Sequence, residues 1–207
     1  MSRLLNAEGH ARDVIVVGAS AGGVHALMGL LSQLPEDLPA VVGIVLHRAP
    51  YRESRLPWLL GRHTKLEVVE PVDDAVLEPG TVYVAPRDQH LLFEKGRARL
   101  SRGPREHMTR PSVDPLFRSA AETYRARVAG VLLTGCGGDG VTGLIGIKGA
   151  GGLSLVQDPR EAPYPTMPSR AIKEDNVDAI LPIEGLAAAI AALASGQAVY
   201  AAAGGGP

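Results

Sequence analysis

The sequence predicts an α/β protein with a doubly wound, mainly parallel sheet and helices on both faces. Four short apolar runs, rich in β-branched residues and leucine, occupy residues 14–17, 41–46, 128–133 and 153–156. Short runs without polar alternation are typical of parallel strands buried on both faces. Stretches with apolar residues at helical spacing separate most of these runs, and this β-α alternation indicates an open parallel sheet.

The remaining elements follow in chain order. The predicted helices cover residues 24–34, 56–60, 115–124, 140–149 and 186–193. One region departs from the alternation, because short strand-like segments joined by turns occupy residues 67–70, 81–85, 91–94 and 98–101. We interpret this region as a small antiparallel β-hairpin addition beside the parallel core.

The chain has 207 residues, enough for one well-buried domain and short for two. We expect this domain to cover residues 12–195. The termini, residues 1–11 and 196–207, are expected to be flexible, and the second of them ends in an Ala/Gly run. Residues 103–114 and 157–168 contain several prolines and predict exposed loops that can line a site.

Composition argues against several classes of partner. The formal net charge is −1 with both signs interspersed, so the chain has no basic stripe for nucleic acid. No apolar run approaches the roughly 20 residues that span a bilayer, and no signal-peptide pattern begins the chain. The single cysteine, Cys136, excludes an internal disulfide framework. We expect a cytoplasmic protein with no nucleic-acid partner and no membrane insertion.

A glycine-rich turn, Gly18-Ala19-Ser20-Ala21-Gly22-Gly23, follows the first apolar run. It places Ser20 where a buried strand becomes a helix, and the N-terminus of that helix offers N–H groups to negative charge. Such a turn suits a nucleophile or a phosphate group. The pattern matches the G-x-S-x-G nucleophile elbow, and it also resembles a loose dinucleotide-binding turn.

Two further strand ends carry side chains that suit a serine nucleophile. His47 directly follows the second run, and Asp139 lies in the glycine-dense turn after the third. The carboxyl ends of parallel strands lie at one edge of a sheet, so we expect Ser20, His47 and Asp139 to meet there. A serine nucleophile needs a base, and the base needs an orienting group. On position alone, His47 can also cap a loop, and Asp139 can be the N-cap of its own helix.

Other interpretations of the Ser20 turn fit less well. In an α/β-hydrolase the triad follows the chain order Ser, then Asp or Glu, then His. Here no histidine follows His107, so this order leaves few candidate partners for Ser20. A dinucleotide site would need a full G-x-G-x-x-G and an acidic residue after the second strand, where Leu46-His47-Arg48 stands. No histidine has metal-ligand spacing with another or with Cys136, which we interpret as a small buried hydrophobe. The sequence therefore predicts neither a metal nor a cofactor.

Together these features closely resemble the catalytic domain of the chemotaxis protein-glutamate methylesterase (CheB) family. The resemblance runs over residues 14–193 and has several pieces in one order. They are the Ser20 turn, Leu46-His47, residues 77–86 with His90, Arg110-Pro111-Ser112-Val113-Asp114 with residues 115–121, residues 132–140, Gln157-Asp158-Pro159 and Met167-Pro168.

The resemblance implies that Ser20 is the nucleophile, His47 the general base and Asp139 the residue that orients it. It implies hydrolysis of glutamyl γ-methyl esters on methylated chemoreceptors, deamidation of receptor glutamine in some members, and no cofactor. Family members usually have Thr after the serine and Met in the turn before the aspartate, and both contribute to the oxyanion site. The corresponding oxyanion or substrate-site candidates here are Ala21, Cys136 and Gly137.

The phosphorylatable receiver domain of the family has no counterpart in residues 1–13. We therefore expect either a separate regulatory protein or constitutive activity. Two other functions stay open. One is a non-catalytic module that binds receptors or signalling partners, because Ala21 has no hydroxyl to donate to an oxyanion. In other enzymes the loss of one oxyanion donor lowers the rate by about 100- to 1000-fold. The other is a hydrolase of a different protein ester.

Overall fold

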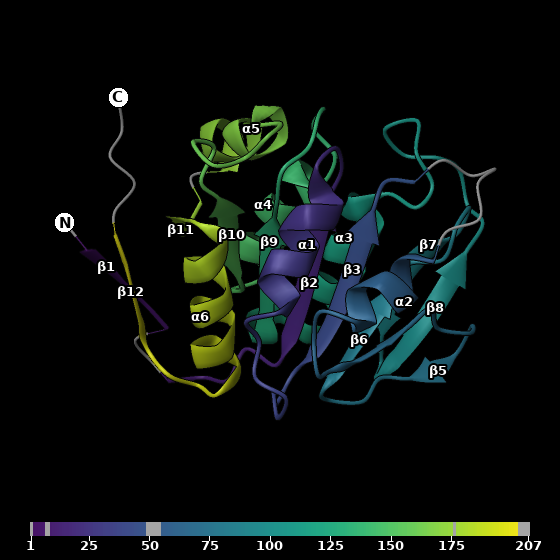
Figure 1. Ribbon diagram of the computed structural model, residues 1–207, viewed down its shortest axis with the longest axis horizontal. Helices are drawn as coiled ribbons and strands as arrows, with labels where there is room; N and C mark the ends of the chain where they lie inside the picture. Colours follow the sequence, from purple (N-terminus) through teal and green to yellow (C-terminus); the bar gives the residue numbers. More distant parts are fainter. Residues whose placement is uncertain (1, 7–8, 49–54, 176, 203–207) are drawn as a thin grey trace.

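The computed structural model describes residues 2–6, 9–48, 55–175 and 177–202. Seven parallel strands form its central sheet, in the order β11-β10-β9-β2-β3-β6-β4. The strands are β2 Val14–Ala19, β3 Val41–Leu46, β4 Glu67–Val69, β6 Thr81–Val84, β9 Val128–Leu132, β10 Leu153–Gln157 and β11 Ala179–Leu181. The doubly wound α/β fold expected from the sequence is confirmed (Figure 1).

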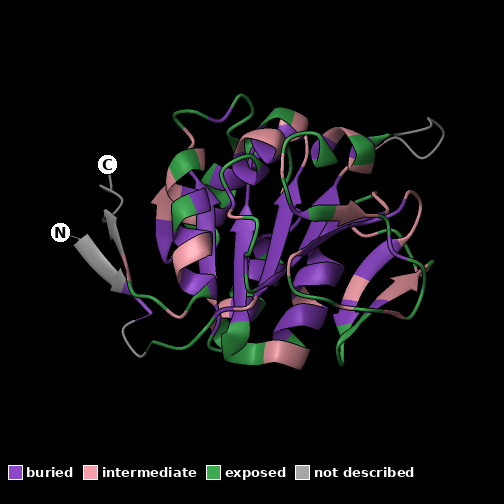
Figure 2. Ribbon diagram, turned by 60° about the horizontal axis from the view of Figure 1, so that its bottom comes forward, coloured by how far each residue is buried: buried purple, intermediate pink, exposed green. Residues whose placement is uncertain are grey.

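Helices cover both faces of the central sheet, because successive side chains of its inner strands point to opposite sides. The helices on one face are α1 (Gly23–Leu31), α2 (Leu56–Gly61) and α6 (Ile183–Ala194). Those on the other face are α3 (Val113–Tyr124), α4 (Val141–Gly149) and α5 (Thr166–Asp175), and the 3₁₀ turn η1 (Arg125–Arg127) follows α3. Burial along the inner strands is therefore continuous (Figure 2).

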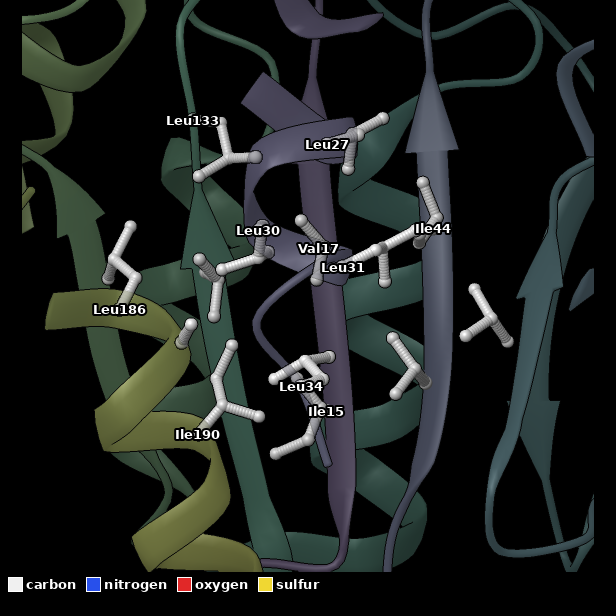
Figure 3. Close-up of a cluster of buried hydrophobic side chains, with 14 of the residues drawn as sticks. Ile15, Val17, Leu27, Leu30, Leu31, Leu34, Ile44, Leu133, Leu186 and Ile190 are labelled. Carbon is white, nitrogen blue, oxygen red and sulfur yellow. The ribbon is translucent and has the colours of Figure 1, made fainter. Parts of the chain in front are cut away.

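The residues of β2 divide between two apolar cores. Ile15 and Val17 pack on the side of α1 and α6, whereas Val14 and Val16 pack on the side of α3 and α4. Figure 3 shows the first core, where side chains of α1 lie over β2 and those of α6 lie on the side of β9 and β10. This arrangement explains why the sequence of β2 shows no polar alternation.

In residues 67–101 the expected antiparallel hairpin is confirmed for His90–Glu94 and Arg97–Ser101, but the two earlier strands of this region belong elsewhere. β4 and β6 join the parallel sheet beside β3. A separate antiparallel sheet consists of β5 (Ala75–Val76), β8 (Arg97–Ser101) and β7 (His90–Glu94), in that order. All four residues of β6 are buried, as an internal parallel strand requires. Local strand signals do not specify a pairing partner, which long-range packing decides.

Phe93 connects the small antiparallel sheet to the central sheet. Its side chain is fully buried and packs edge-on against Tyr83 of β6, with 6.0 Å between the ring centroids. The ring also lies against β3, where a Cβ added to Gly43 would be 2.8 Å from Phe93 Cζ. The absence of a side chain at Gly43 therefore makes room for this contact.

Three other segments depart from the sequence-based expectations. The expected loop at residues 157–168 ends early, because α5 begins at Thr166. The edge strand β11 has no counterpart among the predicted elements. β1 (Ser2–Leu5) and β12 (Val199–Ala202) lie in the termini that were expected to be flexible, and they pair as an antiparallel two-stranded sheet that the sequence did not predict. Residues 1, 7–8 and 203–207 of the same termini lie outside the described residues.

The strand order places a topological switch point at β2, which has β3 on one side and β9 on the other. Catalytic and binding groups of open α/β sheets gather beyond the carboxyl ends of strands at such a point. None of the helices in the described ranges is both long enough and apolar enough to cross a membrane.

Candidate active site

Three polar side chains meet at the carboxyl edge of the central sheet. Ser20 directly follows β2, His47 directly follows β3, and Asp139 lies between β9 and α4. β2 and β3 are parallel with Ala19 opposite Leu46, so the next residue of each strand emerges at the same edge. The N–H of His47 donates to the carbonyl of Ala19 at 3.2 Å and fixes this register to the end of the strands.

Hydrogen bonds join the three side chains in a row. His47 Nδ1 lies 3.1 Å from Ser20 Oγ, and His47 Nε2 lies 2.6 Å from Asp139 Oδ2. The ring therefore presents Nδ1 to the serine and Nε2–H to the carboxylate. Thr109 Oγ1 is 3.4 Å from the same Nε2. Ser20 and His47 are half-buried and Asp139 is buried, so the structure brings together the three residues that the sequence predicted at this edge.

The beginning of α3 holds Asp139 in place. Asp139 Oδ2 accepts hydrogen bonds from the Ser112 hydroxyl at 2.8 Å and the Val113 N–H at 2.7 Å. Asp139 Oδ1 accepts the N–H of Asp114 at 3.0 Å. The residue that caps α4 is Gly140, without a side-chain cap bond. The alternative that Asp139 caps its own helix is therefore wrong, and the carboxylate binds the N–H groups of a different helix N-terminus.

These donors keep the Asp139 carboxyl group ionised. Burial acts to raise its pKa, but hydrogen bonds from His47, Val113, Asp114 and Ser112 outweigh burial and hold the pKa below the ordinary value of 3.8. An ionised Asp139 accepts the Nε2 proton of His47. The other ring nitrogen, Nδ1, then has a lone pair directed at the Ser20 hydroxyl.

Glycine is required at two positions beside Ser20. Gly22, which precedes α1, has a φ of 75°, in the left-handed region that favours glycine. Gly135, in the turn after β9, lies so close to Ser20 that an added Cβ would be 2.7 Å from Ser20 Cβ. The same Cβ would be 2.9 Å from Met167 Cε of α5. Gly135 therefore allows the turn after β9 to lie against the turn after β2.

The predicted oxyanion or substrate-site candidates lie on these two turns. Ala21 is next to Ser20 and is half-buried, whereas Cys136 and Gly137 are exposed. The interpretation of Cys136 as a buried hydrophobe is wrong, because the turn carries its side chain into solvent. Among the hydrogen bonds between described residues, none uses the backbone N–H of Ala21 or Cys136. These two N–H groups therefore have no hydrogen-bond partner among the described residues.

The residues that hold Asp139 were not predicted from their local pattern. Residues 103–114 were expected to form an exposed loop, but Ser112 is 0% and Asp114 is 2% exposed. The segment folds back onto the sheet edge and begins α3 beside Asp139. One local signal points to this helix start, because serine is a preferred N-cap residue and Ser112 directly precedes the helical pattern.

Two more histidines belong to the same neighbourhood. His90 Nδ1 accepts the N–H of Ser112 at 3.3 Å, and His107 Nε2 lies 2.8 Å from Asp114 Oδ2. Ligand-type atoms of His107, Asp114 and Asp139 all lie within 4.8 Å of one another. Both carboxylates already accept backbone N–H groups, so we describe these residues as a hydrogen-bonded network.

Comparison with known proteins gives consistent matches. A family model described as CheB methylesterase matches residues 15–190. A protein-glutamate methylesterase/protein-glutamine glutaminase of Anaeromyxobacter dehalogenans is 42% identical, over 86% of this chain and 52% of that protein. A putative protein of the same description from Leptospira interrogans is 38% identical, over 84% of this chain and 91% of that protein. The crystal structure of the Thermotoga maritima CheB methylesterase catalytic domain matches with a TM-score of 0.82 and 31% identity, covering 86% of this chain and 97% of that one.

The fold and the site define an α/β enzyme with serine, histidine and aspartate at the carboxyl edge of a parallel sheet. The chain spans about half the length of the A. dehalogenans relative and most of the L. interrogans one. It belongs to the CheB methylesterase family. The named members of this family are carboxylic ester hydrolases.

Proposed function

We propose that this protein is a protein-glutamate methylesterase that hydrolyses glutamyl γ-methyl esters on methylated chemoreceptor-type proteins. The observation that carries the proposal is the row of contacts from Ser20 Oγ through His47 to Asp139, at 3.1 and 2.6 Å. The names of the relatives, protein-glutamate methylesterase/protein-glutamine glutaminase, support the class of substrate.

In the first half of the proposed reaction, Ser20 Oγ bonds to the ester carbonyl carbon and His47 Nδ1 takes the hydroxyl proton. Asp139 stabilises the imidazolium and keeps its orientation through Nε2. Negative charge that develops on the carbonyl oxygen is stabilised by the N–H groups of Ala21 and Cys136, with Gly137 next to them on the turn.

In the second half, the bond between the acyl carbon and the methoxy oxygen breaks, and His47 returns its proton so that methanol leaves. Water then attacks the acyl group on Ser20 while His47 takes a water proton. Collapse of this adduct releases glutamate, and the proton returns to Ser20. A glutamine carboxamide would follow the same steps with ammonia as the leaving group, which is the second activity in the names of the relatives. These steps require no cofactor.

The proposed function is tested with methyl-labelled receptor and purified protein. We expect methanol release by the wild-type protein and a loss of about 10⁴- to 10⁶-fold in Ser20→Ala. A fluorophosphonate should label the wild-type protein and not the variant. Ser195→Ala is the matched control, because Ser195 is exposed and, among the described residues, its hydroxyl donates only to the carbonyl of Ala191 one turn earlier. No methanol release by the wild-type protein, or equal release by Ser20→Ala, would refute the proposal.

A second function, a receptor-binding module without turnover, is favoured by one observation. Ala21 supplies no hydroxyl beside Ser20, at a position where family members usually have threonine. Receptor binding by a protein that neither releases methanol nor reacts with a fluorophosphonate would support this alternative. Methanol release that depends on Ser20 would exclude it.

A further inference from the structure

Two buried carboxylates face each other where α3 and α4 begin. Asp139, which precedes α4, accepts the N–H of Val113 at 2.7 Å and of Asp114 at 3.0 Å, at the start of α3. Asp114, in the first turn of α3, accepts the N–H of Gly143 at 2.7 Å, in the first turn of α4. Each helix N-terminus is therefore stabilised by a carboxylate from the start of the other helix.

The two carboxylates differ in their surroundings. Asp139 accepts four hydrogen bonds between described residues, whereas Asp114 accepts the N–H of Gly143 and faces His107. Burial raises the pKa of Asp114, and the nearby charge of Asp139 adds to this rise, while the bonds from Gly143 and His107 oppose it. The ionisation of Asp114 therefore depends on the donors around it, whereas the four hydrogen bonds to Asp139 already keep that carboxyl group ionised.

His107 connects this pair of carboxylates to solvent. Its Nε2 is 2.8 Å from Asp114 Oδ2 and 3.9 Å from Asp139 Oδ1, and its side chain is 41% exposed. By donating Nε2–H to Asp114, His107 favours the ionised form of that carboxyl group. The loop that carries His107 also carries Thr109, which contacts His47 Nε2.

We propose that Asp114, held by His107, is a positioning residue whose negative charge sets the pH range in which the Ser20-His47-Asp139 row is active. The proposal rests on the proposed function of that row. A second negative charge beside Asp139 favours the protonated form of the neighbouring His47 ring. Removing this charge therefore lets His47 release its proton at lower pH.

Other charged groups around Asp114 do not replace it in this role. The titratable or charged side chains that face Asp114 or its contacts come from several elements. They are His47 directly after β3, His90 of β7, Glu106 and His107 of the loop before α3, Arg118 of α3, and Asp139 of the turn before α4. Arg118 is engaged by Glu106 in a two-bond ion pair at 2.7 and 2.9 Å. Asp114 is the carboxylate in direct hydrogen-bond contact with both His107 and the start of α4.

The main test is Asp114→Asn, which removes the charge and keeps the shape. The amide oxygen can still accept the N–H of Gly143, and the amide nitrogen can donate to His107. We expect the acid limb of the kcat/KM profile to move to lower pH by about half a pH unit or more. An acid limb that stays at the wild-type position would overturn the proposal.

A matched control comes from the opposite end of the sheet. Asp178 is also a buried carboxylate, and it accepts the N–H of Ser154 at 3.0 Å near the start of β10. Asp178→Asn removes a buried charge away from Ser20, so its acid limb should coincide with that of the wild-type protein. An equal shift in both variants would overturn the proposal, because it would reflect general loss of buried charge.

His107 is tested with two variants that differ in their donor. His107→Ala removes the donor, favours protonation of Asp114, and is expected to move the acid limb in the same direction as Asp114→Asn. His107→Gln can still donate to Asp114 and should stay close to the wild-type profile. Identical behaviour of the two variants, or a shift of His107→Ala to higher pH, would overturn the part assigned to His107. These variants also test the proposal if Asp114→Asn does not fold.

A substrate-free measurement separates this proposal from the proposed function. The ring nitrogen signals of His47 are followed by NMR during a pH titration of the wild-type protein and Asp114→Asn. A lower titration midpoint in the variant supports the positioning role even if the protein releases no methanol. An unchanged midpoint refutes that role even if methylesterase activity is present.

Discussion

Gly135→Ala tests whether close contact between the turns after β2 and β9 sets the position of Ser20. The added methyl group would lie 2.7 Å from Ser20 Cβ, whereas ordinary contacts begin at 3.4 Å. One of the two turns must therefore move by about 0.7 Å. Met167, whose Cε would be 2.9 Å away, can give way because it ends a flexible side chain, but Ser20 Cβ is attached directly to the backbone.

The expected cost has two parts. Overpacking a buried site usually lowers the free energy of unfolding by about 1–3 kcal/mol. A displacement approaching 1 Å at a reacting group can lower the rate by about 100-fold. Because His47 and Asp139 are held by other elements, the displaced Ser20 loses its alignment with them. We therefore expect kcat/KM for methanol release to fall by about 100-fold.

The assay compares Gly135→Ala with Gly146→Ala. An added Cβ at Gly146 of α4 meets nothing within 4 Å, so that variant should keep its activity. It should also gain about 0.5–1 kcal/mol in unfolding free energy, since alanine favours a helix interior. A Gly135→Ala protein with wild-type stability and a kcat/KM within a factor of about three would refute the reasoning, because the turns would then tolerate the contact.

Two further predictions concern stability. Because the pKa of Asp139 is lower in the folded protein than its ordinary 3.8, the ionised group stabilises the fold above that value, and this contribution is lost as the pH falls through the folded value. Asp139→Asn should therefore have a lower free energy of unfolding than wild type near about pH 6, and this difference should shrink below about pH 4. Urea unfolding over this pH range checks the prediction. A difference in unfolding free energy that does not depend on pH would contradict it. Phe93→Ala should lower the free energy of unfolding by about 3–5 kcal/mol, because Phe93 is fully buried between the two sheets. A loss below about 1 kcal/mol in denaturant titration would show that the small sheet does not depend on this ring.

The sequence predicted the strands that carry Ser20, His47 and Asp139 because each is a short apolar run with no alternation, and parallel strands share one carboxyl edge. It did not predict the partners of Asp139. Ser112 and Asp114 lie in a segment that was expected to be an exposed loop, and the structure buries both. Their burial depends on where α3 begins relative to a turn 25 or more residues later in the chain. Local periodicity does not specify which later segment of the chain the start of a helix will contact.

The dependence on contacts between distant segments also explains why residues 67–70 and 81–85 were assigned to the antiparallel addition. Thr81–Val84 and Glu67–Val69 have local strand character, but their membership of the parallel sheet follows from packing beside β3. The pairing of Ser2–Leu5 with Val199–Ala202 joins the two ends of the chain. Contacts between such distant segments are decided by the whole fold.

The sequence by itself determined the α/β class, the glycine-rich turn at Ser20 and the expectation that Ser20, His47 and Asp139 share one edge, because strand periodicity and turn chemistry are local. Only the tertiary structure decided which ring nitrogen of His47 faces Ser20 and that Asp139 binds the start of α3. It also decided that Asp114 and His107 lie beside Asp139 and contact each other. These features arise where two helix N-termini, far apart in the chain, converge on buried carboxylates. Hydrogen bonds at that junction depend on three-dimensional distances that spacing along the chain does not specify.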